Sequence, residues 1–371
     1  MKTTTKLLTA LVLAGATAGG MADQSNGYYP PMQSLGSETA LIRGVGVTLA
    51  RETGNISRIP QRRFRGGLIG VPVVDVPAPV YTDAKGGMVA GPKGAVVAAP
   101  PVMSRWEIFG GAFYLDEKVD QQNIVVPVVG APPAVIPVRP EYEVETFGGM
   151  LGTRYRINEN WGVGGLVNYS SSDVDATLFG APIGSLDIDN LALVPFVDYI
   201  KEDVFANADL WAGFSYAYGM QDYDVKGTPL SFDGDTHTFE LGADLAFDAG
   251  FMRHGPFAGL RYIDGTVDTF PFNIDLESFA STLGYQVSFP IAGDSGTLVP
   301  QLNVAWEHEF EDNFPIVAFG PTSTVDEDVL VAGAGIGWYA DSGWNLVLDY
   351  RGRFGSEAES HYIGLKAGVT F

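Results

Sequence analysis

The chain has 371 residues, 44 acidic against 22 basic side chains, 47 Gly and no Cys. Its hydrophobic content of 46% is too high for a disordered chain, so we expect a large ordered structure. Without Cys there is no disulfide framework and no thiolate metal site, and four scattered His offer little for a metal centre, so we expect no cofactor. The net charge of −22 argues against a nucleic-acid partner, because phosphates are bound mainly by Lys and Arg.

The first segment, residues 1–22, has the order of a secretory signal peptide. Lys2 and Lys6 precede a short, mostly apolar run from Leu7 to Ala16, and small residues follow as far as Ala22. An apolar run of this length is too short to cross a bilayer as a helix. We therefore expect export from the cytoplasm, with cleavage after Ala22 or, as a second choice, after Ala18.

The next segment, residues 23–104, does not look like a packed domain. Pro, Gly, Ala and Val dominate from Gly66 to Val102, and no helical or strand period is sustained. A basic cluster precedes that stretch, made of Arg51, Arg58, Arg62, Arg63 and Arg65. The segment has a net charge of +3, whereas residues 105–371 carry −27. It is interpreted as a flexible linker, a short passenger, or a basic plug that docks into an acidic cavity.

From residue 105 onward, apolar side chains alternate with polar or small ones. In one segment Phe239, Leu241 and Ala243 share a face, while Glu240 and Asp244 share the other. Such alternation is typical of strands with one apolar face. It predicts twelve strands, near residues 105–115, 142–157, 160–171, 186–199, 204–218, 235–249, 255–264, 277–289, 297–310, 328–340, 343–353 and 360–371.

The connections between these predicted strands alternate in length. Several are very short, such as 158–160, 200–203 and 341–342, whereas those after the odd-numbered strands up to the ninth reach about 11 to 26 residues. Short turns at one end and long loops at the other are expected of an outer-membrane barrel. A soluble β-sandwich would have shorter strands, and these are long enough to cross a bilayer. The predicted fold is all-β, a twelve-stranded antiparallel transmembrane β-barrel spanning residues 105–371.

The end of the sequence carries a more specific pattern. Apolar residues alternate up to a terminal aromatic, at Ile363, Leu365, Ala367, Val369 and Phe371. This pattern resembles the final strand of bacterial outer-membrane proteins, which the barrel-assembly machinery reads as a signal. Together with segments 304–310 and 343–355, the twelve strands resemble the autotransporter β-domain family over residues 106–371. The resemblance implies an outer-membrane barrel, an N-terminal passenger and a helix or linker in the pore. Residues 23–104 depart from it, since they lack the β-helix repeats of large passengers.

Strand parity places thirteen charged side chains on the interior face of the predicted barrel. They are Arg154, Arg156, Asp198, Asp209, Glu240, Asp244, Asp248, Arg261, Glu307, Glu309, Asp349, Arg351 and Lys366. Eight acids against five bases predict an acidic interior. The side chains could form stabilising ion pairs, line a cation-preferring pore, or hold the basic cluster as a plug.

The sequence thus favours a monomeric outer-membrane protein without enzymatic activity. The expected role is structural or surface-exposed, or the anchoring and translocation of a short N-terminal segment, and the alternative is a solute or cation channel. A hydrolase is disfavoured because the four His fall on different strands or turns, with no spacing motif that joins them to a nucleophile. Expected partners are outer-membrane lipid and, during biogenesis, the barrel-assembly machinery.

Overall fold

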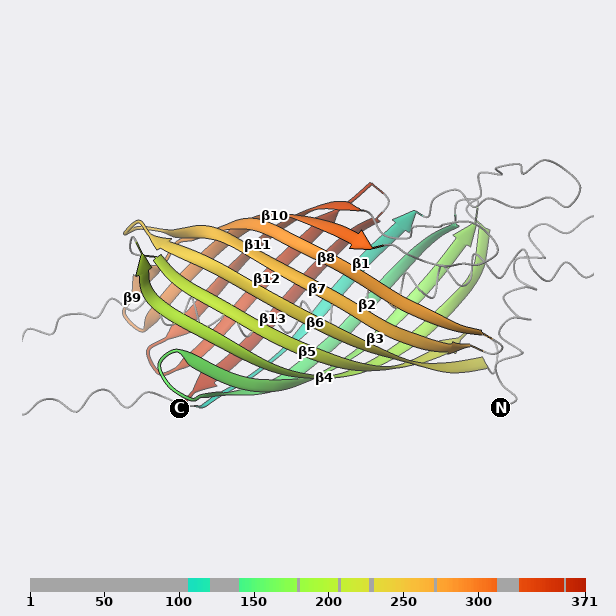
Figure 1. Ribbon diagram of the computed structural model, residues 1–371, viewed down its shortest axis with the longest axis horizontal. Helices are drawn as coiled ribbons and strands as arrows, with labels where there is room; N and C mark the ends of the chain where they lie inside the picture. Colours follow the sequence, from blue (N-terminus) through green and yellow to red (C-terminus); the bar gives the residue numbers. More distant parts are fainter. Residues whose placement is uncertain are drawn as a thin grey trace, which may run out of the picture.

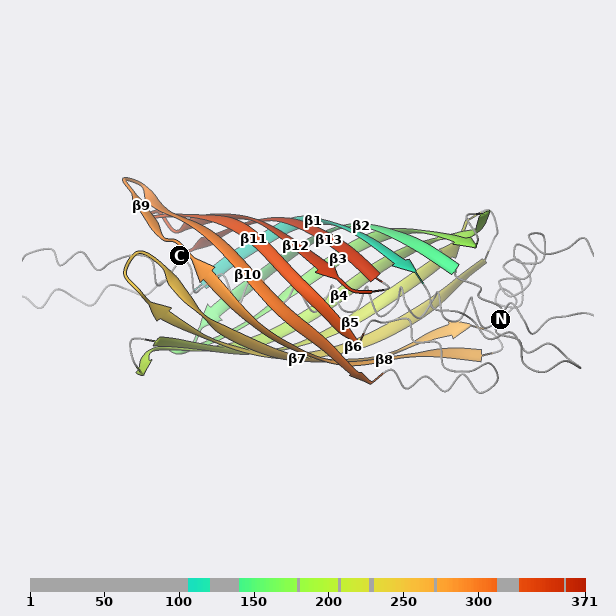
Figure 2. The ribbon, with the colours of Figure 1, turned by 90° about the horizontal axis from the view of Figure 1, so that it is seen from above.

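The computed structural model describes residues 106–120, 140–178, 181–205, 208–226, 230–269, 272–311, 327–356 and 358–371. Within these ranges every regular element is a β-strand, and the strands run at a tilt to the long axis of the molecule (Figures 1 and 2). No helix in the described ranges is long and apolar enough to cross a membrane. The expected signal peptide and segment 23–104 lie outside the described residues, and so does the basic cluster Arg51, Arg58, Arg62, Arg63 and Arg65 that could act as a plug.

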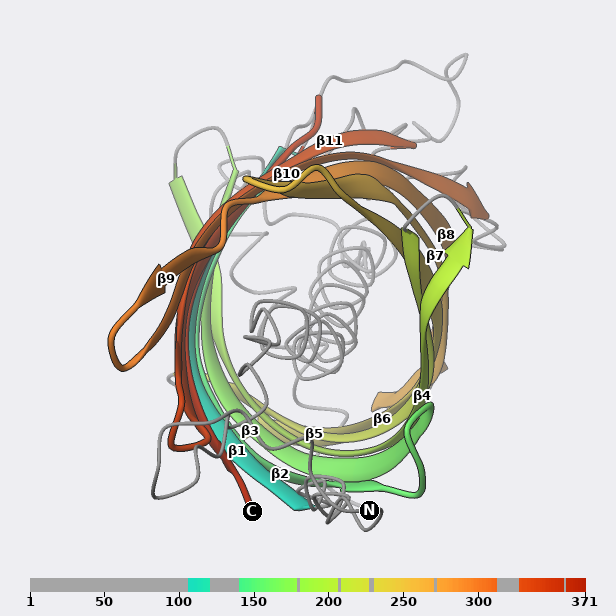
Figure 3. The same ribbon diagram turned by 90° about the vertical axis from the view of Figure 1, so that its left-hand side faces the viewer.

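Thirteen strands are formed, of which twelve are long and one is short. The long strands are β1 (Trp106–Asp120), β2 (Pro140–Arg156), β3 (Trp161–Leu178), β4 (Ala181–Phe205), β5 (Ala208–Val225), β6 (Leu230–Asp248), β7 (Arg253–Thr269), β8 (Phe272–Ser288), β10 (Gly296–Glu311), β11 (Asp328–Ala340), β12 (Trp344–Phe354) and β13 (Ala358–Thr370). The short strand β9 (Ile291–Gly293) pairs only with the start of β10, in a small hairpin that projects from the wall (Figure 3).

The twelve long strands form a closed ring (Figure 3). Each pairs antiparallel with its neighbour in sequence, and β1 pairs with β13 to close the ring. Two reciprocal backbone hydrogen bonds extend this seam, from Trp106 N to Phe371 O at 3.1 Å and from Phe371 N to Trp106 O at 2.9 Å. Closure leaves the long strands without a free sheet edge, as a sheet in hydrocarbon requires.

The two faces of the wall differ in the way the alternation predicts. On β2, Tyr142, Val144 and Thr146 point inward and are buried, whereas Phe147 and Leu151 point outward and are each 66% exposed. Large exposed apolar side chains occur on the outer face all around the ring. An outward apolar surface of this extent is the surface that meets lipid in an outer-membrane barrel.

Aromatic rings lie flat on parts of the inner wall because glycines stand opposite them. Phe113 is directly across from Gly148, and Phe109 from Gly152. A Cβ atom at Gly148 would come within 2.3 Å of the Phe113 ring, and one at Gly152 within 2.4 Å of the Phe109 ring. The same arrangement recurs where Phe196 covers Gly164 and Phe257 covers Gly284. Glycine is therefore required at these positions, and the rings pack on the wall instead of projecting toward the axis.

Several hairpin connections are shorter than the long loops that the sequence predicts. Strands β3 and β4 continue as far as Leu178 and Ala181, so residues 172–185 are mostly strand, and the β7–β8 connection is equally short. The reason is visible in the sequence: Asp173-Val174-Asp175-Ala176 continues the alternation beyond the predicted end of the strand at residue 171. Long connections do separate β1 from β2, at 121–139, and β10 from β11, at 312–327.

Candidate functional site: the barrel interior and its loop end

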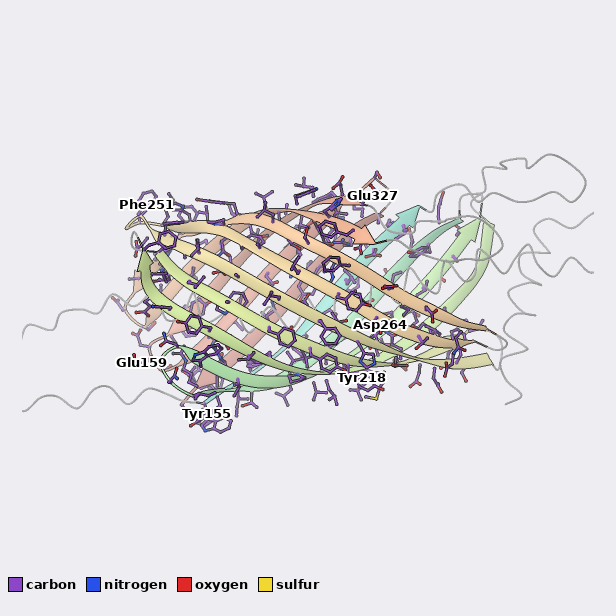
Figure 4. All side chains as sticks on the ribbon, viewed as in Figure 1. Tyr155, Glu159, Tyr218, Phe251, Asp264 and Glu327 are labelled. Atoms are coloured by element: carbon purple, nitrogen blue, oxygen red, sulfur yellow. The ribbon has the colours of Figure 1, made fainter. Side chains whose placement is uncertain are left out.

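The interior and the two ends of the barrel are the candidate functional surfaces. The short connections 157–160, 206–207, 249–252, 289–295 and 341–343 lie together at one end, called the turn end here, and the opposite end is the loop end. Figure 4 shows Tyr155, Glu159 and Phe251 at the turn end, and Asp264 and Glu327 toward the loop end. In an outer-membrane barrel the short turns face the periplasm, so the loop end faces outward from the cell.

Buried charged side chains line the interior near the turn end. Arg154 on β2 forms an ion pair with Asp198 on β4, and both are almost fully buried. Glu107 on β1 lies directly across from Arg154, and Arg156 is on the same face of β2. On the next part of the wall, Arg253 on β7 pairs with Asp209 on β5. A buried charge is stable only when opposite charge and hydrogen bonds compensate its lost hydration. These pairs therefore connect β2 with β4 across β3, and β5 with β7 across β6.

A second group of charges lies further along the interior. Glu307 on β10 accepts hydrogen bonds from Arg261 on β7 at 3.1 Å and from Arg353 on β12 at 2.6 Å. Each of these contacts skips one strand, β8 or β11, so a single carboxylate ties together three strands of the wall. Glu240 lies across from Arg261, and Ser278 donates to Glu309 at 2.7 Å.

The third group lies beside the seam. Lys366 on β13 contacts Asp349 on β12 at 2.6 Å, and both are shielded from solvent. The Arg351 guanidinium stands 5.3 Å from the centre of the Tyr362 ring, and the Lys366 ammonium stands 5.9 Å from it. Both distances are within the range of cation–π attraction.

Most, but not all, of the charged residues that strand parity predicts for the interior do lie there. Asp248 does not join them: it is exposed at the last position of β6, where it accepts a hydrogen bond from the Gly250 N–H, because the strand gives way to a turn there. Sequence reasoning also missed Glu107, Glu117, Arg253 and Arg353, which are all buried. Arg353 shares the parity of Asp349 and Arg351 and could have been found, whereas Arg253 and Glu117 lay beyond the predicted ends of their strands. The inward charges of the described strands are then nine acids and seven bases, a surplus of only two.

The loop-end half of the interior is apolar on strands β1 to β8. We call this surface the loop-end collar; its buried side chains are Val119, Tyr142, Val144, Val174, Ala176, Leu186, Ile188, Tyr223, Val225, Phe232, Ile263, Val267 and Leu276. The collar itself has no charged member, but the buried side chain of Glu117 on β1 lies directly across from Val144. An apolar inner surface of this size was not predicted, since we expected the inward face to be wet.

Uncharged polar side chains line the wall beside the collar, toward the turn end. Thr146 and Ser172 are hydrogen-bonded at 2.8 Å, and Asn190 donates to Ser170 at 3.4 Å. Asn168 is 1% exposed, and neither its amide oxygen nor its amide nitrogen has a hydrogen-bond partner. We call the group Asn168, Ser170, Asn190 and Gln221 the amide band, after its three amide side chains.

Most of the negative charge of the barrel lies on the outside, around the loop end. We call this surface the outer rim; its acids alternate with the collar residues and include Asp116, Glu141, Glu143, Glu145, Asp173, Asp175, Asp187, Asp189, Asp222, Asp224, Asp233, Asp235, Asp264, Asp268, Asp275, Glu277, Asp328 and Glu359. Lys226, in a turn beyond the strands, contacts Asp173 at 2.5 Å and Asp187 at 2.9 Å. Hydrogen bonds to these two carboxylates raise the pKa of the Lys226 ammonium.

Aromatic donors and three of the four histidines lie on the outer face directly below this rim, whereas His254 lies on the outer face at the turn end. Tyr169 donates to Asp189 at 2.8 Å, and the Trp306 indole N–H donates to Asp328 at 2.8 Å. All four His of the chain stand on the outer face next to aromatic rings, as in the contacts of His308 with Trp306 and of His361 with Tyr350. None of them faces the interior. Aromatic groups with one apolar and one polar side suit the membrane–water boundary.

The predicted assembly strand forms the seam itself. Ile363 and Leu365 of β13 are each 50% exposed on the outer face, and Phe371 is 61% exposed at the turn end. Ala367 and Val369 share the parity of these residues.

Comparison with known proteins identifies the family to which this barrel belongs. The autotransporter β-domain family model matches residues 138–351. The translocator domain of the Neisseria meningitidis autotransporter NalP is similar, with a TM-score of 0.50, 14% identity, and coverage of 87% of this chain and 98% of that one. The transport unit of Escherichia coli AIDA-I gives 0.53, 10% identity, and coverage of 74% and 92%. The β-domain of Bordetella BrkA gives 0.48, 15% identity, and coverage of 71% and 99%.

No curated protein sequence matches the chain. The solved structures share too little sequence to show more than a common fold, but the family model covers more than half of the chain. A closed ring of twelve antiparallel strands, with lipid-facing apolar residues outside and paired charges inside, agrees with that match. The chain belongs to the autotransporter β-domain family and forms an outer-membrane translocator barrel.

Proposed function

We propose that this barrel anchors and carries a short N-terminal segment, residues 23–104, after removal of the signal peptide 1–22. The observation that carries the proposal is the position of Trp106, which starts β1 at the turn end and is hydrogen-bonded to Phe371. Residues before Trp106 therefore meet the barrel on its periplasmic side. Because unpaired backbone is not tolerated in hydrocarbon, a route to the cell surface runs through the interior.

A tag experiment tests the proposal. An epitope tag at residue 30 should be detected by antibody on intact cells, and a protease added outside should remove it. A tag in the 312–326 connection serves as the surface control, and a tag in the 341–343 turn serves as the periplasmic control. A residue-30 tag that becomes accessible only after the outer membrane is opened would refute surface delivery and would favour a plug or a periplasmic linker.

The role that we propose is not enzymatic. The support is the placement of the histidines, since all four stand on the outer face among aromatic rings. Their polar contacts within the described residues are to Asp, Glu and Tyr side chains, as in the contact of His308 with Asp328, and none is to a Ser or Thr hydroxyl. A hydrolytic triad needs a His within hydrogen-bond reach of both a nucleophile and an acid.

A solute or cation channel is the second candidate function. The charged side chains of the barrel interior are the reason to test it. Charged groups such as Glu307 and Lys366 face the interior, but salt bridges occupy them. For the complete protein in planar bilayers we expect low conductance with weak cation preference. Deletion of residues 23–104 should raise the conductance if that segment lies in the interior. A large conductance that the deletion leaves unchanged would support an open channel and contradict an occupied interior.

A further inference from the structure

Two prolines interrupt the hydrogen-bonded pairing of the wall, and both stand beside the hairpin formed by β5 and β6. Pro195 of β4 lies across from Tyr216 of β5, where the β4–β5 pairing skips two successive positions. Pro256 of β7 interrupts the β6–β7 pairing in the same way, across from Leu245. Proline has no N–H to donate, so the carbonyl groups of Tyr216 and Leu245 lose the hydrogen bond that a regular ladder provides. The two interruptions therefore lie on the two edges of one hairpin.

The first interruption lies in the middle of the lipid-facing belt. Pro195 is four residues from Tyr199 at the turn-end boundary and four residues from Leu191, near the loop-end boundary. Pro256 is two residues from His254, so the second interruption is closer to the turn end. Hydrocarbon contains no water that could replace a missing hydrogen bond, so an unpaired carbonyl is costly there. We therefore expect these two ladders to open more readily than the others.

The ladders next to these two are continuous. β5 pairs with β6 without a gap from Ala208 to Val225, and β7 pairs with β8 without a gap along all of β7. The hairpin lies between β4 and β7 in the ring (Figure 1). The other irregularities of the described strands lie near strand ends, at 176–177, 201–205 and 309–311. The β5–β6 hairpin is thus a continuous unit between two weakened ladders.

The inward face of the hairpin carries a further unsatisfied group. The indole N–H of Trp211 on β5 is buried and has no hydrogen-bond partner among the described residues. A buried donor without a partner costs free energy in the closed wall. Beside the first interruption, the inward side chains Val194 and Ala217 are apolar, so no ion pair joins the two strands at this depth.

Ion pairs hold the two ends of the hairpin. At the loop end, Lys226 contacts Asp187 of β4 at 2.9 Å. At the turn end, Asp209 of β5 pairs with Arg253 of β7. Regions that open locally are those with few stabilising contacts, so movement of the hairpin is confined to the part between these attachments.

We propose that the β5–β6 hairpin is a movable panel of the barrel wall. It separates from β4 at Pro195 and from β7 at Pro256 as one unit, while the ion pairs at its ends keep it in the ring. The movement widens the interior between β4 and β7, so the width of the interior is not fixed. The panel is a property of the wall and does not rest on the proposed function.

Residue-resolved amide hydrogen exchange of the complete protein in lipid nanodiscs tests the panel. Alternate residues of an antiparallel strand bond to opposite neighbours, so Tyr216 and Tyr218 face β4, whereas Ser215 and Ala217 face β6. The Tyr216 and Tyr218 amides should exchange about tenfold faster than the other two, although all four lie at nearly the same depth. Equal exchange rates for the two pairs would overturn the proposal.

Restoring the missing donor gives the matched variant. Pro195→Ala places an N–H across from the Tyr216 carbonyl and should slow exchange of the Tyr216 and Tyr218 amides about tenfold. Pro300→Ala is the control for removal of a proline, because Pro300 lies on β10 in a ladder with β11 that has no gap. The control should leave the two rates unchanged. Exchange that Pro195→Ala does not slow would contradict the panel.

Coupling between the two edges distinguishes one panel from two independent weak points. The amides of Ala243 and Leu245 face β7, and Pro195→Ala should slow their exchange as well if the hairpin moves as a unit. Because the chain has no Cys, a disulfide between Val194→Cys and Ala217→Cys gives a reversible lock across the skipped positions. Oxidation should slow exchange at both edges, and reduction should restore it.

Slowing at the β4 edge alone, with either the alanine variant or the disulfide, would overturn the panel. The residue-30 tag reports independently on surface delivery. An accessible tag with uncoupled edges refutes only the panel, and a protected tag with coupled edges refutes only delivery.

Discussion

At the scale of single residues, the inner wall depends on two kinds of fitted contact. Aromatic rings such as Phe113 and Phe109 occupy the space that glycines leave free across the strand. Charged groups such as Arg154 and Asp198 are buried in contact with each other. Both contacts tolerate little change, since one depends on the absence of a Cβ atom and the other on the presence of both charges.

Replacement of Gly148 by Val should destabilise the barrel. Its Cβ would lie 2.3 Å from the Phe113 ring, so the ring must leave the wall, which costs about 1–3 kcal/mol by comparison with other overpacked sites. Urea unfolding in lipid vesicles, followed by tryptophan fluorescence, measures the change. Gly149→Val is the matched control, because a Cβ there comes no closer than 3.4 Å to any neighbour. Equal unfolding midpoints for the two variants would contradict the argument.

Replacement of Arg154 by Met should be costly because it leaves the Asp198 carboxylate buried without its partner. The expected loss is about 3–5 kcal/mol, and the double variant Arg154→Met/Asp198→Leu should recover much of it, since an apolar pair needs no compensation. The same urea titration applied to both single variants and to the double variant gives the coupling. A double variant no more stable than Arg154→Met would show that the pair does not act as a unit.

At the scale of the strands, alternation predicted the elements well and their ends poorly. All twelve wall strands and the apolar outer face follow from a period of two, as on β6 with Phe239, Leu241 and Glu240. The extension of β3 and β4 was missed because Asp and Ser are typical loop residues, although the period continues through Val174 and Ala176. Those inward apolar residues form part of the collar, so the same error hid the apolar half of the interior. Ion-pair partners such as Glu307 and Arg353 could not be predicted, because register and curvature bring them together across a skipped strand.

Truncation of the terminal aromatic should impair assembly of the ring. Phe371 lies beside Trp106 at the seam and is exposed on the lipid side, so Phe371→Ala removes an interfacial ring from the strand that completes closure. We expect less folded, heat-modifiable barrel in cell envelopes. Trp338→Ala, an equally outward aromatic on β11, is the control for simple loss of an interfacial ring. Equal yields for the two variants would argue against a special role of the terminal residue.

At the scale of the whole molecule, the charge is divided between a nearly balanced interior and an acidic exterior. The −27 of residues 105–371 gathers largely on the outer rim, where carboxylates stand directly across from one another, as Glu145 does from Asp173 and Asp189 from Asp222. Like charges in such positions repel and weaken the sheet locally. The rim thus lies outside the hydrocarbon and marks the end of the barrel that faces away from the cell.

Salt should therefore stabilise the barrel. Raising the monovalent salt concentration from about 0.01 M to about 0.5 M shortens the screening length well below 10 Å and weakens the repulsion around the rim. The urea midpoint should rise with salt, and it should rise less in the variant Asp189→Asn/Asp222→Asn, which removes one opposed pair. Glu159→Gln, in a turn at the other end, should leave the salt response unchanged. A midpoint that is independent of salt in all three proteins would show that the rim charges are already compensated.

The seam between β1 and β13 joins the two described strands that are furthest apart in sequence. Its hydrogen bonds close the largest loop in the molecule, so the entropic cost of forming it is the highest and it is expected to pair late in folding. Until then the wall is an open, curved sheet with two unpaired edges. The residues that precede Trp106 start at one of those edges, so they can be laid against the inner face while the sheet is still open and enclosed when the seam pairs. Such a segment would be wrapped during assembly, with no need to be threaded through a finished ring.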